Sequence, residues 1–211
     1  MTVGNEDGRV TTWPVDLRGV TETLVTTEGP NGRWNVAPLG VHAPKDDRID
    51  PNSETQPTAR TWGRTRTWRN FREQREGYVH FTRDPELFVE AALGIVEQDD
   101  PVLSGTDAWV RVDVERIKSG HRGETHWTDW RLLARESGIR SRRIHACNRG
   151  YAAVVEATVA ASRLDVDTYD ADTLRERIAY FEEVCRRCGG PPEQAAFDRL
   201  CELIDERRNG R

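Results

Sequence analysis

The sequence predicts a mainly β protein with C-terminal helices, an α+β fold in which a barrel of antiparallel strands precedes a helical hairpin. A hairpin pattern occupies residues 23–37, apolar and polar residues alternate strictly over residues 108–115, and helical spacing begins after residue 148. Strands followed by helices are typical of the α+β class. We therefore divide the chain into a barrel domain at residues 1–147 and a helical extension at residues 148–211, packed on the barrel or on a dimer partner.

Composition limits the function classes. At 211 residues the chain is long enough to bury a core without disulfides, so its four cysteines need not be paired. Charged residues make up 32% and the net charge is -5, which argues against a globally basic nucleic-acid binder. The sequence contains no apolar run of membrane-spanning length and no signal-peptide core at its start, so we expect a soluble, cytoplasmic protein.

The hairpin pattern is the stretch around which the chain is organised. Two β-favouring runs, Thr23 to Thr27 and Arg33 to Ala37, flank the turn formers Gly29 to Gly32. The second run continues into Ala37-Pro38-Leu39-Gly40-Val41. Because proline cannot donate to a strand ladder and glycine leaves the backbone bare, we expect a ligand, rather than a neighbouring strand, to approach this segment.

A second unusual stretch, Arg60 to Arg72, is rich in arginine and tryptophan. Thr67 is the expected N-cap of a helix that runs towards Arg75. Arginines beside the positive end of a helix are unfavourable unless an anion joins them, so this place suits a phosphate. A solvated arginine surface, or single-stranded nucleic acid stacked on the tryptophans, are the alternatives.

Other elements follow in order. We expect a loose start at residues 1–11 and a surface loop or irregular edge strand at residues 43–58, which are rich in turn formers. Asp84 and Pro85 begin a short helix that carries Leu87, Phe88, Ala91 and Ala92. Strands are expected at residues 78–82, 108–115 and 125–134, with a turn at 119–123 between the last two.

The last third is helical. Residues 151–162 are apolar on nearly every side except at Glu156, whose buried carboxylate would need a partner such as Arg149. A second helix carries Leu174, Ile178, Phe181, Cys185 and Cys188 and ends at Gly189-Gly190-Pro191-Pro192, and a third carries Phe197, Leu200, Cys201 and Ile204.

Motifs for common cofactors and metals are weak or absent in the sequence. It has no Gly-x-Gly-x-x-Gly or Gly-Lys-Ser/Thr motif. Cys185 and Cys188 form a Cys-x-x-Cys, but they share a helical stripe with core residues and no second pair exists, so we interpret them as packing. His121 and His126 lie five apart without a reinforcing carboxylate or thiolate. We therefore expect no metal site.

Five segments together resemble an archaeal family, domain of unknown function family 447. They are Glu22 to Thr27, Asn35 to Val41, Arg64 to Asn70, Asp84 to Leu93, and Asn148 to Arg163, and they occur in the family's order. Members resemble flavin-reductase-like split barrels that bind flavin mononucleotide (FMN), commonly at a homodimer interface. The sequence departs from the family pattern at Leu39, where methionine is usual, and at Trp68, where tyrosine is usual.

The resemblance implies a cofactor site in two parts. The first, along the flavin ring, comprises Asn35, Ala37, Pro38, Leu39, Gly40 and Val41. The second, around the phosphate, comprises Arg64, Thr65, Arg66, Thr67 and Asn70.

The implied activity is that of an FMN-dependent oxidoreductase, with nicotinamide or another electron donor as partner. A non-catalytic module that binds FMN or another phosphorylated ligand is the alternative. The sequence assigns no catalytic residue and no substrate; His42 beside the ring segment, and Asn148 and Arg149 at a helix start, are further candidates for contact with ring or substrate.

Overall fold

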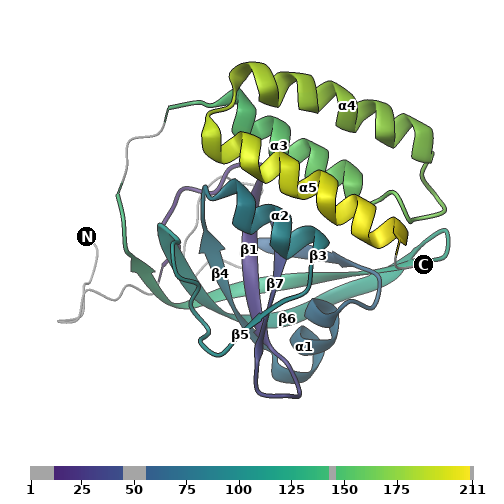
Figure 1. The fold of residues 1–211 in the computed structure, drawn as a ribbon. Coiled ribbons are helices and arrows are strands. Elements are labelled where there is room, and N and C mark those ends of the chain that lie inside the picture. Colours follow the sequence, from purple (N-terminus) through teal and green to yellow (C-terminus); the bar gives the residue numbers. More distant parts are fainter. Residues whose placement is uncertain (1–11, 45–55, 143–145, 210–211) are drawn as a thin grey trace. The chain divides into compact units, whose positions relative to one another are not determined.

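A computed structural model describes residues 12–44, 56–142 and 146–209. The expected loose start at residues 1–11 and most of the loop expected at residues 43–58 lie outside this part of the chain. The described residues divide into two compact units, which Figure 1 shows together with their elements. Among the described residues, the first unit comprises 12–44, 56–82 and 97–142, and the second comprises 83–96 and 146–209.

The first unit is a closed antiparallel barrel. Six strands follow one another in the order β1-β4-β6-β7-β3-β2, and pairing between β2 and β1 closes the ring, while β5 adds a seventh strand beside β2. The strands are β1 (Val20–Glu28), β2 (Trp34–His42), β3 (Thr58–Trp62), β4 (Glu76–Phe81), β5 (Val96–Gln98), β6 (Ala108–Arg122) and β7 (Thr125–Ile139).

Alternation in the sequence explains the core of this barrel. Val110, Val112 and Val114 on β6 are buried, and the residues between them are half-buried. Together with Val25, Val41, Phe71 and Leu132 they belong to one apolar cluster. Closure of the ring leaves no exposed edge on these six strands along their paired lengths.

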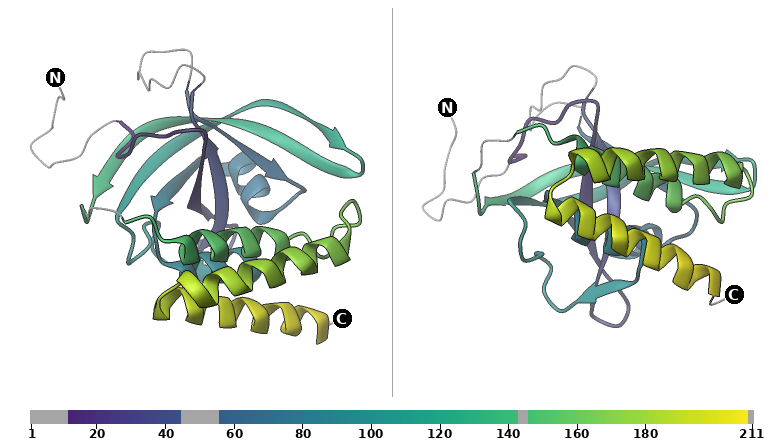
Figure 2. Two further views of the ribbon diagram at one scale, coloured as in Figure 1. Left: turned by 90° about the horizontal axis from the view of Figure 1, so that it is seen from above. Right: turned by 45° about the horizontal axis from the view of Figure 1, so that its top comes forward.

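The strands β6 and β7 are the longest and run side by side as a hairpin, as Figure 2 shows. The turn expected at residues 119–123 is shorter in the structure, because pairing continues to Arg122↔Thr125. His121 and His126 therefore face each other across two strands instead of lying in a loop.

Helix α1 (Arg66–Gln74) connects β3 to β4 and belongs to the barrel unit. Its Phe71 is fully buried and meets the ring of Trp130 edge-on, with 5.5 Å between the ring centroids. The helix ends at Arg75, which takes the left-handed conformation with φ 57°.

The second unit is helical. It contains α2 (Pro85–Leu93), α3 (Arg149–Ala161), α4 (Ala171–Cys188) and α5 (Pro191–Asn209), and it has its own apolar cluster. The expected N-cap Asp84 accepts hydrogen bonds from the N–H groups of Glu86 and Leu87, which confirms the start of α2. None of the described helices is both long and apolar enough to cross a membrane.

Candidate functional site

Strand β2 holds the Asn35 to Val41 segment in a ladder with β1. Pairing extends from Glu28↔Trp34 to Val20↔His42 and includes Leu24↔Pro38. The expectation that no strand approaches this segment is therefore wrong on the β1 side. A proline is tolerated in a strand where its missing N–H would face away from the neighbour.

The opposite side of β2 is different. The Thr23 hydroxyl donates to the Leu39 carbonyl at 2.6 Å, so the backbone groups of Leu39 face β1. Because backbone groups alternate along an antiparallel pair, those of Pro38 and Gly40 face the side away from β1. On that side β3 joins at Val41 and His42. Pro38 and Gly40 thus direct their backbone groups towards the edge where β3 pairing begins.

Burial separates the predicted ring segment into two kinds of residue. Asn35, Leu39 and Val41 are buried, whereas Ala37, Pro38 and Gly40 are half-buried. The first three therefore hold the strand in place, and Ala37 also packs against the apolar cluster of the barrel. His42, at the end of the strand, is exposed.

The phosphate segment lies at the N-terminus of α1. Thr65 is the N-cap, and its Oγ1 accepts a hydrogen bond from the backbone N–H of Trp68 at 3.3 Å. The prediction that Thr67 caps the helix is wrong, because Thr67 lies inside it and is buried. No acidic residue occupies the first turn, so the positive end of the helix dipole is uncompensated by carboxylates of its own helix.

The two predicted arginines differ in their surroundings. Arg66 forms an ion pair with Glu97, with 2.9 Å between Nη1 and Oε1. Arg64 is exposed, and its guanidinium lies 5.9 Å from the centre of the Trp68 ring. Within the described part of the chain Arg64 has no ion pair, so it is the arginine that is free to meet an anion.

Asn70 connects the two predicted segments. Its amide donates to the hydroxyl of Thr27 at 3.0 Å and to the Thr27 carbonyl at 3.3 Å, and Thr27 pairs with Asn35 across the β1–β2 ladder. Asn70 is buried, so it fastens α1 to the barrel. The local sequence gives no signal for this contact, because Thr27 is simply one of several β-favouring residues in the run from Thr23 to Thr27.

Arg60, in the same arginine-rich stretch, is fully engaged. Its guanidinium makes two hydrogen bonds to the Asp129 carboxylate, at 2.6 and 2.9 Å, and lies 4.3 Å from the centre of the Trp127 ring. The hydrogen bonds to Asp129 raise the pKa of Arg60. These contacts connect β3 to β7. They engage the Arg60 guanidinium and the Trp127 ring, which a nucleic-acid surface would need free for contact with phosphates and bases.

Other candidates have structural roles. Glu156 is exposed, so the prediction of a buried carboxylate is wrong: the polar side of α3 faces solvent. Burial raises the pKa of the Cys185 thiol, which donates to the carbonyl of Glu193 at 3.3 Å. Asn148 caps α3 by accepting from the N–H of Gly150 at 2.7 Å. Among described residues, no three His, Cys, Asp or Glu side chains gather as metal ligands.

The closed six-stranded barrel, the seventh strand and the C-terminal helices define a protein of the mixed α+β class. The chain belongs to the DUF447 family, described as proteins of unknown function. Residues 21–141 match the N-terminal domain of that family and residues 148–202 match its second domain.

Among solved structures, the chain is similar to an FMN-bound protein of the DUF447 family from Methanosarcina mazei. The identity is 24%, the TM-score is 0.70, and the match covers 90% of this chain and 96% of the other. This likeness shows the shared fold.

Two weaker matches are the flavin reductase of styrene monooxygenase from Pseudomonas putida S12 and an FMN-binding protein from Thermus thermophilus with bound p-hydroxybenzaldehyde. The first is 16% identical, covers 58% of this chain and 82% of the reductase, and has a TM-score of 0.36. The second is 14% identical, covers 61% and 79% of the two chains, and has a TM-score of 0.36. At these scores neither supports a conclusion about this chain.

Proposed function

We propose that this protein binds FMN along β2 and the N-terminus of α1, and that it is an FMN-dependent oxidoreductase. The observation that carries the proposal is membership of the DUF447 family, which also contains the FMN-bound Methanosarcina mazei protein of the same fold. When bound, FMN would supply hydride or electron transfer, while the protein binds, orients and shields it.

The ring would lie against the half-buried part of β2. The N–H of Gly40 is a donor for the hydrogen-bonding edge of an isoalloxazine. A Cβ at this position would lie 3.1 Å from Cγ1 of Val20, so the glycine lets Val20 lie against the strand. Pro38 stiffens the same edge, because its φ angle is fixed. The buried residues Asn35, Leu39 and Val41 keep the strand in register.

The phosphate would lie at the N-terminus of α1. There the unpaired backbone N–H groups and the helix dipole favour an anion. The Thr65 oxygen already accepts from Trp68, which leaves its hydroxyl hydrogen for a phosphate oxygen. Arg64 adds a charge-assisted bond, Arg66 a second cation, and the buried Thr67 and Asn70 position the turn.

The geometry suits an elongated ligand. Asn35 is linked to α1 through Thr27, and Gly40 lies five residues further along β2. Because a strand rises by about 3.3 Å per residue, the surface between them extends over roughly 17 Å. FMN has its ring and its phosphate at opposite ends of a ribityl chain. A helix N-terminus near one end of β2 and an open backbone near the other match that shape.

The decisive test is to titrate the Arg64→Gln variant with FMN and to measure the binding affinity by calorimetry. We expect FMN affinity to fall by about tenfold, because one charge-assisted hydrogen bond is lost. Riboflavin, which lacks the phosphate, should bind the variant and the unchanged protein equally. Arg135→Gln, which removes an exposed arginine from β7, is the matched control and should leave both affinities unchanged.

A protein that remains colourless after expression with ample flavin, and that shows no heat of FMN binding, would disprove the proposal. Equal loss of FMN and riboflavin affinity in Arg64→Gln would instead remove the assigned role of Arg64.

Stopped-flow mixing of the flavin-loaded protein with NADH or NADPH tests the oxidoreductase part. Rapid bleaching supports it, whereas a flavin that only dithionite reduces favours the non-catalytic binding module. We further propose a homodimer with flavin near its interface, which sedimentation of the loaded protein at several concentrations checks.

A further inference from the structure

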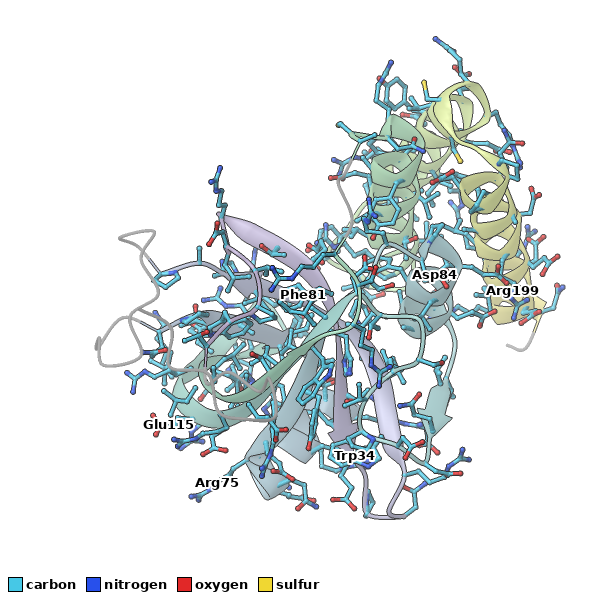
Figure 3. All side chains as sticks on the ribbon, turned by 90° about the vertical axis from the view of Figure 1, so that its left-hand side faces the viewer. Trp34, Arg75, Phe81, Asp84, Glu115 and Arg199 are labelled. Carbon is cyan, nitrogen blue, oxygen red and sulfur yellow. The ribbon has the colours of Figure 1, made fainter. Side chains whose placement is uncertain are left out.

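A cavity of about 450 Å³ lies at the other end of α1, away from the proposed phosphate position. It is formed within the barrel unit by the last turn of α1, by β6 and by Trp130 of β7. Figure 3 shows Arg75 from the end of α1 and Glu115 from β6 on the same side of this unit. A volume of this size accommodates a small organic molecule.

The floor of the cavity is apolar and rigid. It consists of Phe71, Val114 and Trp130, which are almost completely buried. The rings of Phe71 and Trp130 pack edge-to-face, and the indole N–H donates to the Thr61 hydroxyl at 2.9 Å. The floor therefore offers carbon surface without a donor of its own.

The rim is strongly basic. Arg72, Arg75 and Arg116 line it, together with one carboxylate, Glu115. Two of these charges are already compensated: Arg72 pairs with Glu73 at 2.6 Å, and Glu115 pairs with Arg131 at 3.0 Å.

Arg75 and Arg116 have no ion pair within the described residues. Two positive charges thus remain at one mouth. Both side chains are exposed, and an anion in the mouth of the cavity would be attracted to both.

The backbone at Arg75 gives an independent indication. Its φ of 57° is the left-handed conformation that closes α1, and among described residues it is the one non-glycine with positive φ. Glycine adopts this conformation without strain, whereas another residue costs about 1 kcal/mol. The Arg75 carbonyl accepts from the N–H of Val114 at 2.8 Å, which fixes the turn against the cavity floor. An arginine is thus held at a strained position where its side chain lines the cavity.

We propose that this cavity binds a small organic dianion, a phosphate ester with a compact apolar body, at a site separate from that of FMN. Arg75 and Arg116 would neutralise the two charges by charge-assisted hydrogen bonds. The apolar body would cover the floor, because the cavity is larger than a bare phosphate requires. The site would therefore give the protein a second phosphorylated ligand, beyond the cofactor.

Calorimetric titration with phenyl phosphate tests the proposal on the full chain. We expect saturable binding that weakens by about tenfold in each of Arg75→Gly and Arg116→Gln, with weaker binding of inorganic phosphate. Arg69→Gln, which removes an exposed arginine from α1 outside the cavity lining, should bind like the unchanged protein. Arg75→Gly should also have an equal or higher melting temperature, because glycine relieves the backbone strain.

Three results would overturn the proposal. The first is no binding of phenyl phosphate. The second is an equal loss of affinity in the Arg69 control, which would mean a diffuse charge effect. The third is competition, in which saturating FMN displaces phenyl phosphate, because then the cavity would belong to the flavin site. FMN binding is measured in a separate titration. A protein that binds FMN but not phenyl phosphate would therefore refute the second site alone, and a protein that binds phenyl phosphate but not FMN would refute the proposed cofactor alone.

Discussion

His80 on β4 is a histidine buried inside the barrel unit. Its side chain is fully buried, and its Nε2 accepts a hydrogen bond from the backbone N–H of Leu103 at 3.2 Å. Burial, with a smaller contribution from the charge of Arg140, lowers the pKa of His80 to about 4. The native protein therefore holds this imidazole neutral at every pH above about 4.

The pH dependence of stability follows from that pKa. In the unfolded chain histidine titrates near 6.5, so between pH 6.5 and 4 the unfolded state binds more protons. The contribution of His80 is complete above pH 6.5 and is lost as the pH falls to 4, about 3 kcal/mol in all. In urea unfolding, the free energy of unfolding of His80→Gln should therefore fall by about 3 kcal/mol less than that of the unchanged protein between pH 6.5 and 4. An unchanged slope for His80→Gln would refute this assignment.

At the scale of single elements, helix α1 shows what local pattern can and cannot predict. A helix from the Arg64 to Asn70 region towards Arg75 was predictable from its polar cap and apolar residues, and it is present. The cap itself was misassigned to Thr67, because Thr65 and Thr67 are equally good N-caps in isolation. Burial of Thr67 against the barrel decides between them, and that contact is not encoded locally.

The strands show the same limit. Alternation predicted β6 only to Glu115, although the strand continues to Arg122, because the residues from Glu115 to Ser119 are all exposed and so leave no periodic signal. In β2, Pro38 reads as an interruption, yet pairing with β1 continues through it. Whether a proline breaks a strand depends on which side its neighbour lies, and the sequence alone does not contain that information.

Gly150, in the family-like segment that begins at Asn148, has a structural role at the start of α3. A Cβ at this position would lie 2.3 Å from Cα of Gly189 and 2.6 Å from its backbone nitrogen. The first turn of α3 can therefore approach the end of α4 this closely only because residue 150 is a glycine.

Gly150→Ala should accordingly lower the free energy of unfolding by about 1–3 kcal/mol, the usual effect of overpacking. Thermal or urea unfolding measures the change. Gly190→Ala is the matched control, because its added methyl would meet the flexible side chain of Glu193 at 3.3 Å and make an ordinary van der Waals contact with Cδ of Pro192 at 3.7 Å. Equal destabilisation by both variants would contradict the assigned contact.

For the whole molecule, the least predictable feature was which compact unit each segment of the chain belongs to. Helix α2 was correctly expected between two strands, and its cap is as predicted. It nevertheless belongs to the same compact unit as α3, α4 and α5. Val89 and Leu93 of α2 lie in the helical core, and the Arg207 side chain donates to the Leu93 carbonyl at 3.0 Å. Nothing in the local sequence of α2 indicates a partner more than a hundred residues later.

This organisation predicts how the protein responds to truncation. A fragment of residues 1–147, which ends where the barrel domain was expected to end, retains α2 but removes its partner helices α3 and α5, together with α4. We expect the fragment to expose Val89 and Leu93, to bind a hydrophobic dye more strongly than the full chain and to aggregate, because a buried apolar face then meets water.

The matched control is the same fragment with Val89→Ser and Leu93→Gln, which makes that face of α2 polar. It should be less aggregated and bind less dye, since these two side chains account for apolar surface that the helical core otherwise covers. Size-exclusion chromatography and dye fluorescence measure both effects. A monodisperse 1–147 fragment with dye binding no greater than that of the full chain would show that α2 does not depend on the C-terminal helices.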